Sequence, residues 1–450
     1  MVPIVRDTCR GEPLKKPVMR PTQGISMTRK LLSVALLTSV AAFTSPAYAA
    51  DLGGDCCADL EERIAELEAT TARKGNRKVS LTVSGWVAEQ VTYWDDGQQS
   101  NAYVGGIGST LASHFKLTGQ ATIAPGWTAG YVVQIEQNST NSLALDQNND
   151  DAGAGIVLLQ SYWFLASEKL GKVSVGQLSQ ASDNAAILVD SSGSLVPANW
   201  VIPFDTGAFR FRNPDGTLNA LGWSDVTTCG SLSASVGGDC NGVPLNAVRY
   251  DTPTFLGFSA SASWGEDDFW DVAARYAGEF NGIKIAAAVA YHQITDERPL
   301  GVLSATKRDS SYVQAGLYLQ HVPTGLFAYG AYGNEDNDTI YLNGLAAKDS
   351  EVWYVKAGLR RKLRSIGHTV VYGEYGNYDD QLGPAALAAN VAGSEVEHWG
   401  VGIVQEIDAA AMSLWLSYRS FEADLDTAAG AAAVNTDDFQ LVKFGALINF

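Results

Sequence analysis

From Val79 to the last residue, Phe450, apolar and polar residues alternate with a period of two in one segment after another. In residues 79–94 the odd positions are mostly apolar, and the even positions are mostly small or polar. A period of two predicts a β-strand, because successive side chains of a strand point to opposite faces. Strands of globular proteins usually have about five or six residues. This segment is longer, and it exceeds the roughly 9–11 residues that a strand needs to cross a bilayer.

The connections between these segments alternate in length. Short turns, such as the hairpin signal Asn281-Gly282, alternate with long polar loops such as residues 334–350. This alternation is typical of outer-membrane barrels, and lipid does not tolerate an open sheet edge. The sequence therefore predicts an all-β fold, a 16-stranded antiparallel transmembrane β-barrel. The sixteen predicted strands are 79–94, 111–123, 127–137, 157–167, 172–178, 247–251, 255–264, 269–280, 283–292, 311–322, 326–333, 351–360, 368–378, 395–407, 411–421 and 438–450.

The aromatic residues also fit a barrel in a membrane. The last predicted strand alternates on one face and ends in Phe450, an aromatic residue at the expected lipid-facing position. Aromatic residues near strand ends are candidates for the girdles at the two membrane interfaces. These candidates are Tyr93, Trp94, Trp127, Trp163, Tyr291, Trp353 and Trp415.

The residues ahead of the barrel have the form of an export signal. Residues 27–49 comprise a basic pair, an apolar run at 31–43 and an Ala-x-Ala site that ends at Ala49, where cleavage is expected. Residues 1–26 are interpreted as an upstream extension from a misassigned start codon. Residues 50–78 are expected to be a periplasmic segment with a short helix or coiled coil at 58–73. Residues 79–450 form the predicted barrel.

The charge of the chain excludes one class of partner. The whole sequence carries 31 Lys or Arg and 49 Asp or Glu. Residues 1–49 contain seven of the basic and two of the acidic residues, so the mature chain has a formal net charge of −23. Such an acidic chain is not expected to bind nucleic acid. It is suited to an interior or to loops that attract cations.

Four cysteines follow the expected cleavage site. Export permits disulfides, and Cys229 and Cys240 stand in a Gly- and Ser-rich stretch, where we expect them to staple a loop. The roles of the adjacent Cys56 and Cys57 stay open, including bonding between subunits.

No enzyme motif is present in the sequence. The five histidines are scattered singly, and neither a zinc-protease motif nor a nucleotide-binding loop occurs. We expect no catalytic residues, no protein-bound metal and no cofactor. The one exception weighed is a loop-bound Ca²⁺: Asp146, Asn148 and Asp150 have the first three spacings of a calcium loop but lack its glycine.

Two segments in the middle of the chain resemble a known family. Residues 248–258, VRYDTPTFLGF, resemble the strand pair after the third loop of Gram-negative general porins. Residues 270–278, WDVAARYAG, are more similar still to the alphaproteobacterial porin family. The layout is similar from Val79 to Phe450. The resemblance implies an outer-membrane homotrimer whose barrels each form a water-filled pore for small hydrophilic solutes and ions. It also implies contact with outer-membrane lipid and lipopolysaccharide.

The resemblance further implies that the third loop, here residues 179–246, folds inward as a constriction. The segment 202–207, IPFDTG, loosely matches the acidic constriction motif of such porins. Opposed charges across the narrowest section would produce a transverse field, and the acidity suggests a preference for cations. Arg210 and Arg212 leave the field of the loop uncertain. The acidic candidates are Asp183, Asp190 and Asp205, and the basic wall candidates, which alternation places inward, are Lys116, Arg249, Arg275 and Lys284.

Two other functions stay open at this point. The first is a structural barrel whose segment at 58–73 tethers the outer membrane to the cell wall, with conduction incidental. The second is a substrate-specific channel, which would show saturable currents. The sequence alone does not distinguish them from a general pore.

Overall fold

Antiparallel strands form a closed barrel in the computed structural model, which describes residues 78–229, 238–265, 268–296, 305–342, 344–428 and 433–450. The upstream extension, the export signal and the helix at 58–73 lie outside the described residues. Within the described ranges, no helix is both long and apolar enough to cross a membrane.

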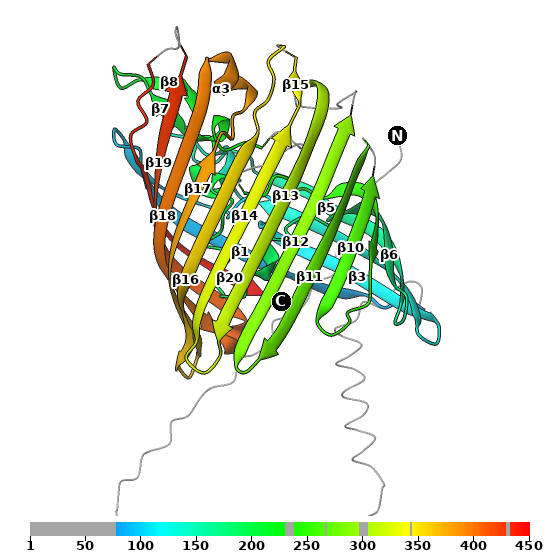
Figure 1. Cartoon of the computed structure of the whole chain (residues 1–450). Coiled ribbons are helices and arrows are strands. Elements are labelled where there is room, and N and C mark those ends of the chain that lie inside the picture. The colour runs from blue at the N-terminus through cyan, green and yellow to red at the C-terminus, as the bar shows by residue number, and fades with distance from the viewer. Residues whose placement is uncertain (1–77, 230–237, 266–267, 297–304, 343, 429–432) are drawn as a thin grey trace, which may run out of the picture. The chain divides into compact units, whose positions relative to one another are not determined.

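Sixteen strands of the described residues make up the wall. In order around the barrel they are β1 (Thr82–Asp95), β3 (Ser113–Ala124), β4 (Trp127–Asn138), β5 (Gly155–Ser167), β6 (Gly171–Leu178), β9 (Leu245–Asp251), β10 (Phe258–Gly265), β11 (Phe269–Phe280), β12 (Ile283–Asp296), β13 (Ala305–His321), β14 (Leu326–Asn337), β16 (Ser350–Arg364), β17 (Gly367–Asp379), β18 (Val391–Ile407), β19 (Met412–Thr427) and β20 (Phe439–Asn449). β20 pairs with β1 and closes the barrel. The strands are tilted in Figure 1.

The remaining elements are not among the sixteen strands of the wall. They are strands β2 (Ser100–Gly105), β7 (Arg210–Arg212), β8 (Leu218–Gly222) and β15 (Ile340–Tyr341), the short helices α2 (Pro203–Thr206) and α3 (Pro384–Ala388), and the 3₁₀ turns η1 (Ser142–Ala144), η2 (Ile187–Val189), η3 (Trp223–Asp225) and η4 (Asp408–Ala410). Figure 1 shows β7, β8, β15 and α3 at one end of the barrel, the end that carries the long loops.

The prediction of a 16-stranded antiparallel barrel is confirmed. Each predicted strand coincides with a wall strand, and the differences are at the ends. For example, β12 continues to Asp296 and β13 begins at Ala305. The two strands pair with each other as far as Asp296 and Arg308, and the first residues of β13 pair with β15. Alternation did not indicate these extensions because a strand that projects beyond the bilayer needs no apolar face. At the opposite end, Asn281 and Gly282 have φ angles of 49° and 75°, as a two-residue hairpin turn requires.

The two faces of the wall differ as alternation predicts. Exposed apolar residues such as Val87, Val355 and Phe444 face outward, whereas Gln314 and His398 are buried inside. The terminal residue Phe450 exchanges backbone hydrogen bonds with Gly85 and is exposed, in agreement with its expected lipid-facing position.

The prediction of a place in the interfacial girdles is wrong for two aromatic residues. Trp94 and Trp415 are buried, and they belong to the inward sets of β1 and β19. Inside the barrel Trp94 packs on Phe209 of the long loop, with ring centroids 4.9 Å apart. Position near a strand end did not identify the face on which an aromatic residue lies.

Candidate functional site

The described residues between β6 and β9, 179–229 and 238–244, lie inside the barrel. The hydroxyl groups of three tyrosines on the inner wall donate hydrogen bonds to their backbone carbonyl oxygens: Tyr329 to Ala186 at 2.8 Å, Tyr378 to Trp200 at 2.8 Å and Tyr312 to Gly238 at 2.7 Å. We call this segment the inner loop. Its course inside the barrel agrees with the predicted inward fold.

The inner loop has an apolar core of its own. Trp200, Trp223 and Phe209 of the loop are buried. Phe209 contacts Phe439 of β20 with ring centroids 4.7 Å apart, and Trp223 contacts Phe421 of β19 at 6.2 Å. Burial of large aromatic side chains is among the strongest contributions to packing. The loop is therefore held against one side of the wall by the same forces that hold a globular core together.

Asp205, in α2, is bound by two cations of the wall. Its Oδ2 lies 2.5 Å from Nη1 of Arg419, and its Oδ1 lies 2.5 Å from Nζ of Lys443. Burial raises the pKa of the Asp205 carboxyl, but the charges of Lys443 and Arg419 outweigh burial and hold the pKa below its usual range. Arg419 also binds Glu374, with Nε 2.9 Å from Oε1. This cluster anchors the loop to β17, β19 and β20.

Asp190 forms a second anchor of the same kind. Its Oδ2 lies 2.6 Å from Nζ of Lys356 on β16, and both side chains are almost completely buried. The same Nζ donates a hydrogen bond of 2.8 Å to the carbonyl oxygen of Ala198. Two of the predicted acidic residues thus bind wall cations and hold the loop in place.

Arg249 and Arg275 hold the start of the inner loop. Nη1 of Arg249 donates hydrogen bonds to the carbonyl oxygens of Ser179 and Gln180, at 2.8 and 3.0 Å. Nη2 of Arg275 donates to the carbonyl oxygen of Ala181 at 2.6 Å. The guanidinium groups point inward, as alternation predicts, and contact loop backbone. Neither forms an ion pair with a loop carboxylate among the described residues.

A cavity of about 320 Å³ remains between the inner loop and the opposite wall. Lys116 and His114 of β3 line it on the wall side, and Asp183 and Asp239 line it on the loop side. Burial raises the pKa of the Asp183 carboxyl to about 7, and burial raises that of Asp239 well above its usual range. Of the predicted site residues, Lys116 and Asp183 are the two that line this cavity. We refer to the cavity below as the passage.

Lys284 is not at this passage. It lies two residues after Gly282 of the Asn281-Gly282 turn, at the second position of β12, and it is exposed. It does not line the cavity. Arg212 is also remote from the cavity, since it forms an ion pair of 2.6 Å with Asp96 in the loop after β1.

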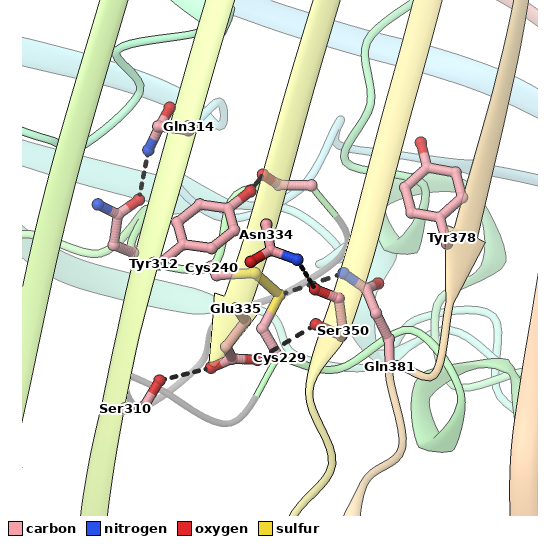
Figure 2. The surroundings of a disulfide bond; sticks show 12 residues. Cys229, Cys240, Ser310, Tyr312, Gln314, Asn334, Glu335, Ser350, Tyr378 and Gln381 are labelled. Atoms are coloured by element: carbon pink, nitrogen blue, oxygen red, sulfur yellow. Dashed lines mark hydrogen bonds between the residues drawn. A yellow bond between two sulfur atoms is a disulfide. The ribbon is translucent and has the colours of Figure 1, made fainter. Parts of the chain in front are cut away.

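The predicted staple of the loop is present as a disulfide between Cys229 and Cys240. Figure 2 shows it beside the inner wall, where Gln381 donates a hydrogen bond of 3.4 Å to Sγ of Cys229. On the other side, Gln314 of β13 donates to Oδ1 of Asn241 at 2.8 Å. The disulfide therefore fixes the returning limb of the inner loop.

Replacing both cysteines by serine should destabilise this limb. A disulfide typically contributes about 2–4 kcal/mol, largely by restricting the unfolded chain. We expect lower thermal stability and stronger fluctuation of the open-channel current in a planar bilayer. Adding a reductant to the unmodified protein should reproduce the effect, and a reductant should not change the double serine variant.

Comparison with known proteins gives the family. The sequence profile described as Gram-negative porin matches residues 35–424. The chain belongs to the Gram-negative porin family. It is accordingly an outer-membrane β-barrel channel and not an enzyme. Among curated proteins, no sequence matches this porin significantly.

Solved structures share the fold at low sequence identity. The anion-selective porin from Comamonas acidovorans is 16% identical, with a TM-score of 0.55, and the match covers 83% of this porin and 100% of that chain. The outer membrane channel DcaP of Acinetobacter baumannii is 12% identical, with a TM-score of 0.50, and the match covers 84% of this porin and 99% of that chain. These likenesses support the barrel fold of the porin.

Several lumen residues of the porin escaped the sequence analysis. Lys356, Arg419 and Lys443 bind the loop, Glu374 binds Arg419, and Asp239 lines the cavity. A signal for one of them was available. Lys443 stands between Val442 and Phe444, which face outward, so alternation places the lysine in the lumen. Nothing in the sequence indicates that Asp239 returns to the passage, because the inner loop has no periodic pattern.

Proposed function

We propose that this porin is a passive diffusion channel for small hydrophilic solutes and ions, with a preference for cations. The supporting observation is the cavity between the inner loop and β1, β3, β4 and β5, with Asp183 and Asp239 at its loop side. The other two acidic candidates are engaged in ion pairs: Asp190 binds Lys356, and Asp205 binds Arg419 and Lys443. Burial raises the pKa of both carboxyl groups, so they favour cations over the one lysine, Lys116, only where the pH is high enough to ionise them.

The test is the reversal potential of purified protein in a planar bilayer under a salt gradient at about pH 8, where the Asp183 carboxyl is mostly charged. We expect a potential that favours cations and a conductance that does not saturate with salt. A potential that favours anions would contradict the cation preference and leave the channel function standing. A folded, inserted protein that passes no current would contradict the channel function itself.

The cation preference should depend on pH. The pKa of Asp183 is raised to about 7, so its carboxyl is neutral at lower pH and charged at higher pH. Cation selectivity should therefore increase as the pH rises from about 6 to 8. The Asp183→Asn variant should keep a low selectivity throughout that range. An unchanged reversal potential of the unmodified protein between these pH values would refute the role of Asp183.

We further propose a homotrimer of the alphaproteobacterial porin type, surrounded elsewhere by outer-membrane lipid and lipopolysaccharide. In support, the outer face of the first strands is concave and apolar. A hollow of about 420 Å³ there is lined by Val87, Phe115, Ile135 and Ile156, among others. Chemical cross-linking in mild detergent should yield a threefold mass, and channels should open in groups of three.

The tether alternative depends on residues 58–73, which lie outside the described residues. Deleting residues 50–75 from the mature chain separates the two functions. A channel should keep its single-channel conductance after the deletion. If the chain is chiefly a tether, cells with the deletion should release outer-membrane vesicles while the purified barrel stays unchanged.

A further inference from the structure

The cavity at the passage has apolar as well as charged walls. Ile187, Leu188 and Leu195 of the inner loop line it together with Leu159 of β5. A passage that only passed hydrated ions would need no such surface. Its volume, about 320 Å³, lies at the lower end of the roughly 300–1,000 Å³ typical of small-molecule sites.

Leu188 is the most informative of these residues. Its side chain is 65% exposed, whereas Ile187 and Val189 on either side are 7% exposed. The neighbouring residues are sufficient to seat η2 against the wall, where Ala186 and Val189 lie over Gly316 of β13. Leu188 contributes little to that packing, and it presents an apolar side chain to the lumen. Contact of such a surface with water is unfavourable, so a solute with an apolar group gains by covering it.

The charged side chains that line the cavity have hydrogen-bonding and ion-pairing positions that a ligand can occupy. Oδ1 of Asp239 is buried and accepts no hydrogen bond within the described part of the chain. Oδ1 of Asp183 accepts a bond of 2.5 Å from its neighbour Asn184, and the side chain of Ser179 also hydrogen-bonds to the Asp183 carboxyl. On the wall side, no ion pair joins Lys116 to an acidic residue among those described. A buried carboxylate oxygen without a donor favours a ligand that brings one.

We propose that the passage binds zwitterionic solutes that carry an apolar side group, the chemistry of an apolar α-amino acid. The solute carboxylate lies at Lys116, its ammonium group lies at Asp183 and Asp239, and its side group lies against Leu188 and Leu195. This inference rests on the proposed channel function and names the solutes for which the channel is a selective path.

The experiment measures blocking of the ion current through the full-length mature porin by L-leucine and by L-serine. The two solutes carry the same charges and differ in the apolar group. We expect leucine to block at a concentration about tenfold lower than serine, and a block that saturates. Equal blocking by the two amino acids would overturn the proposal.

Variants separate the apolar from the charged contacts. Leu188→Ser should weaken blocking by leucine about fivefold, a change of the size that one apolar contact produces, and leave blocking by serine unchanged. Lys116→Gln should weaken both. The matched control is Leu342→Ser, an exposed leucine that does not line the cavity, and it should change neither. Equal effects of Leu188→Ser and Leu342→Ser would also overturn the proposal.

A second readout keeps this inference distinct from the channel function. Trp86 lines the cavity, so its fluorescence reports binding even in a protein that passes no current. Saturable quenching or enhancement by leucine, absent with serine, supports the site. Leucine binding without current would refute the channel and retain the site, whereas current without leucine binding would refute the site and retain the channel.

Discussion

Replacing Asp205 by asparagine should release the inner loop from the wall and change the channel more than any other conservative substitution. The side chains of Arg419 and Lys443 are 2% and 4% exposed, and both bind Asp205. Loss of one partner of a buried ion pair typically costs about 3–5 kcal/mol, because the remaining charge stays buried without compensation. Arg419 retains Glu374, whereas among the described residues the hydrogen bond that Lys443 retains is to the carbonyl oxygen of Pro197, at 3.2 Å.

The expected result is a lower free energy of unfolding and a larger, noisier conductance, because the loop no longer keeps its distance from the opposite wall. Urea unfolding in detergent and single-channel recording measure the two effects. The matched control is Asp215→Asn, an acid of the same loop that is exposed and binds only Thr217 of its own turn. If the two variants behave alike, Asp205 is not an anchor.

The barrel was predictable because its determinant is local. A strand with lipid on one side and water on the other needs alternation along its whole length, and each short turn carries its own signal, as Asn281-Gly282 does. The inner loop obeys no such rule. Its position depends on which wall residues its acidic side chains bind. Residues 179–244 show no periodic pattern of apolar and polar residues, so their sequence does not predict these pairs.

The site was therefore predictable in part. The disulfide is confirmed, and Asp183 and Lys116 line the cavity, while their role in a constriction stays a prediction. Asp190 and Asp205 were expected to face the passage, with Arg249 and Arg275 opposite. The structure instead pairs these acids with Lys356, Arg419 and Lys443, more than 150 residues further along the chain. Alternation along a strand predicts that a lysine points into the lumen. It does not predict how far along the barrel axis the lysine lies or which loop residue it faces.

Replacing Gly316 by valine should push the inner loop into the passage and reduce the conductance. A Cβ atom on Gly316 would lie 2.5 Å from the carbonyl oxygen and 2.9 Å from Cα of Ala186. Both are backbone atoms, so the loop has to move. Overpacking of this kind typically costs about 1–3 kcal/mol. The displaced segment contains Ile187 and Leu188, which line the cavity, and movement away from β13 narrows it.

This substitution opposes the first one in its effect on the current. Asp205→Asn weakens the attachment of the loop and should raise the conductance and its noise. Gly316→Val pushes the loop away from β13 and should lower the conductance with little added noise. The control is Gly330→Val on β14, where a Cβ atom meets only the carbonyl oxygen of Tyr354, at 3.8 Å. Valine is a good strand residue, so the control should fold and conduct normally. Equal conductance of Gly316→Val and Gly330→Val would mean that the segment around Ala186 does not set the width of the passage, and the bottleneck would then have to lie elsewhere along the inner loop.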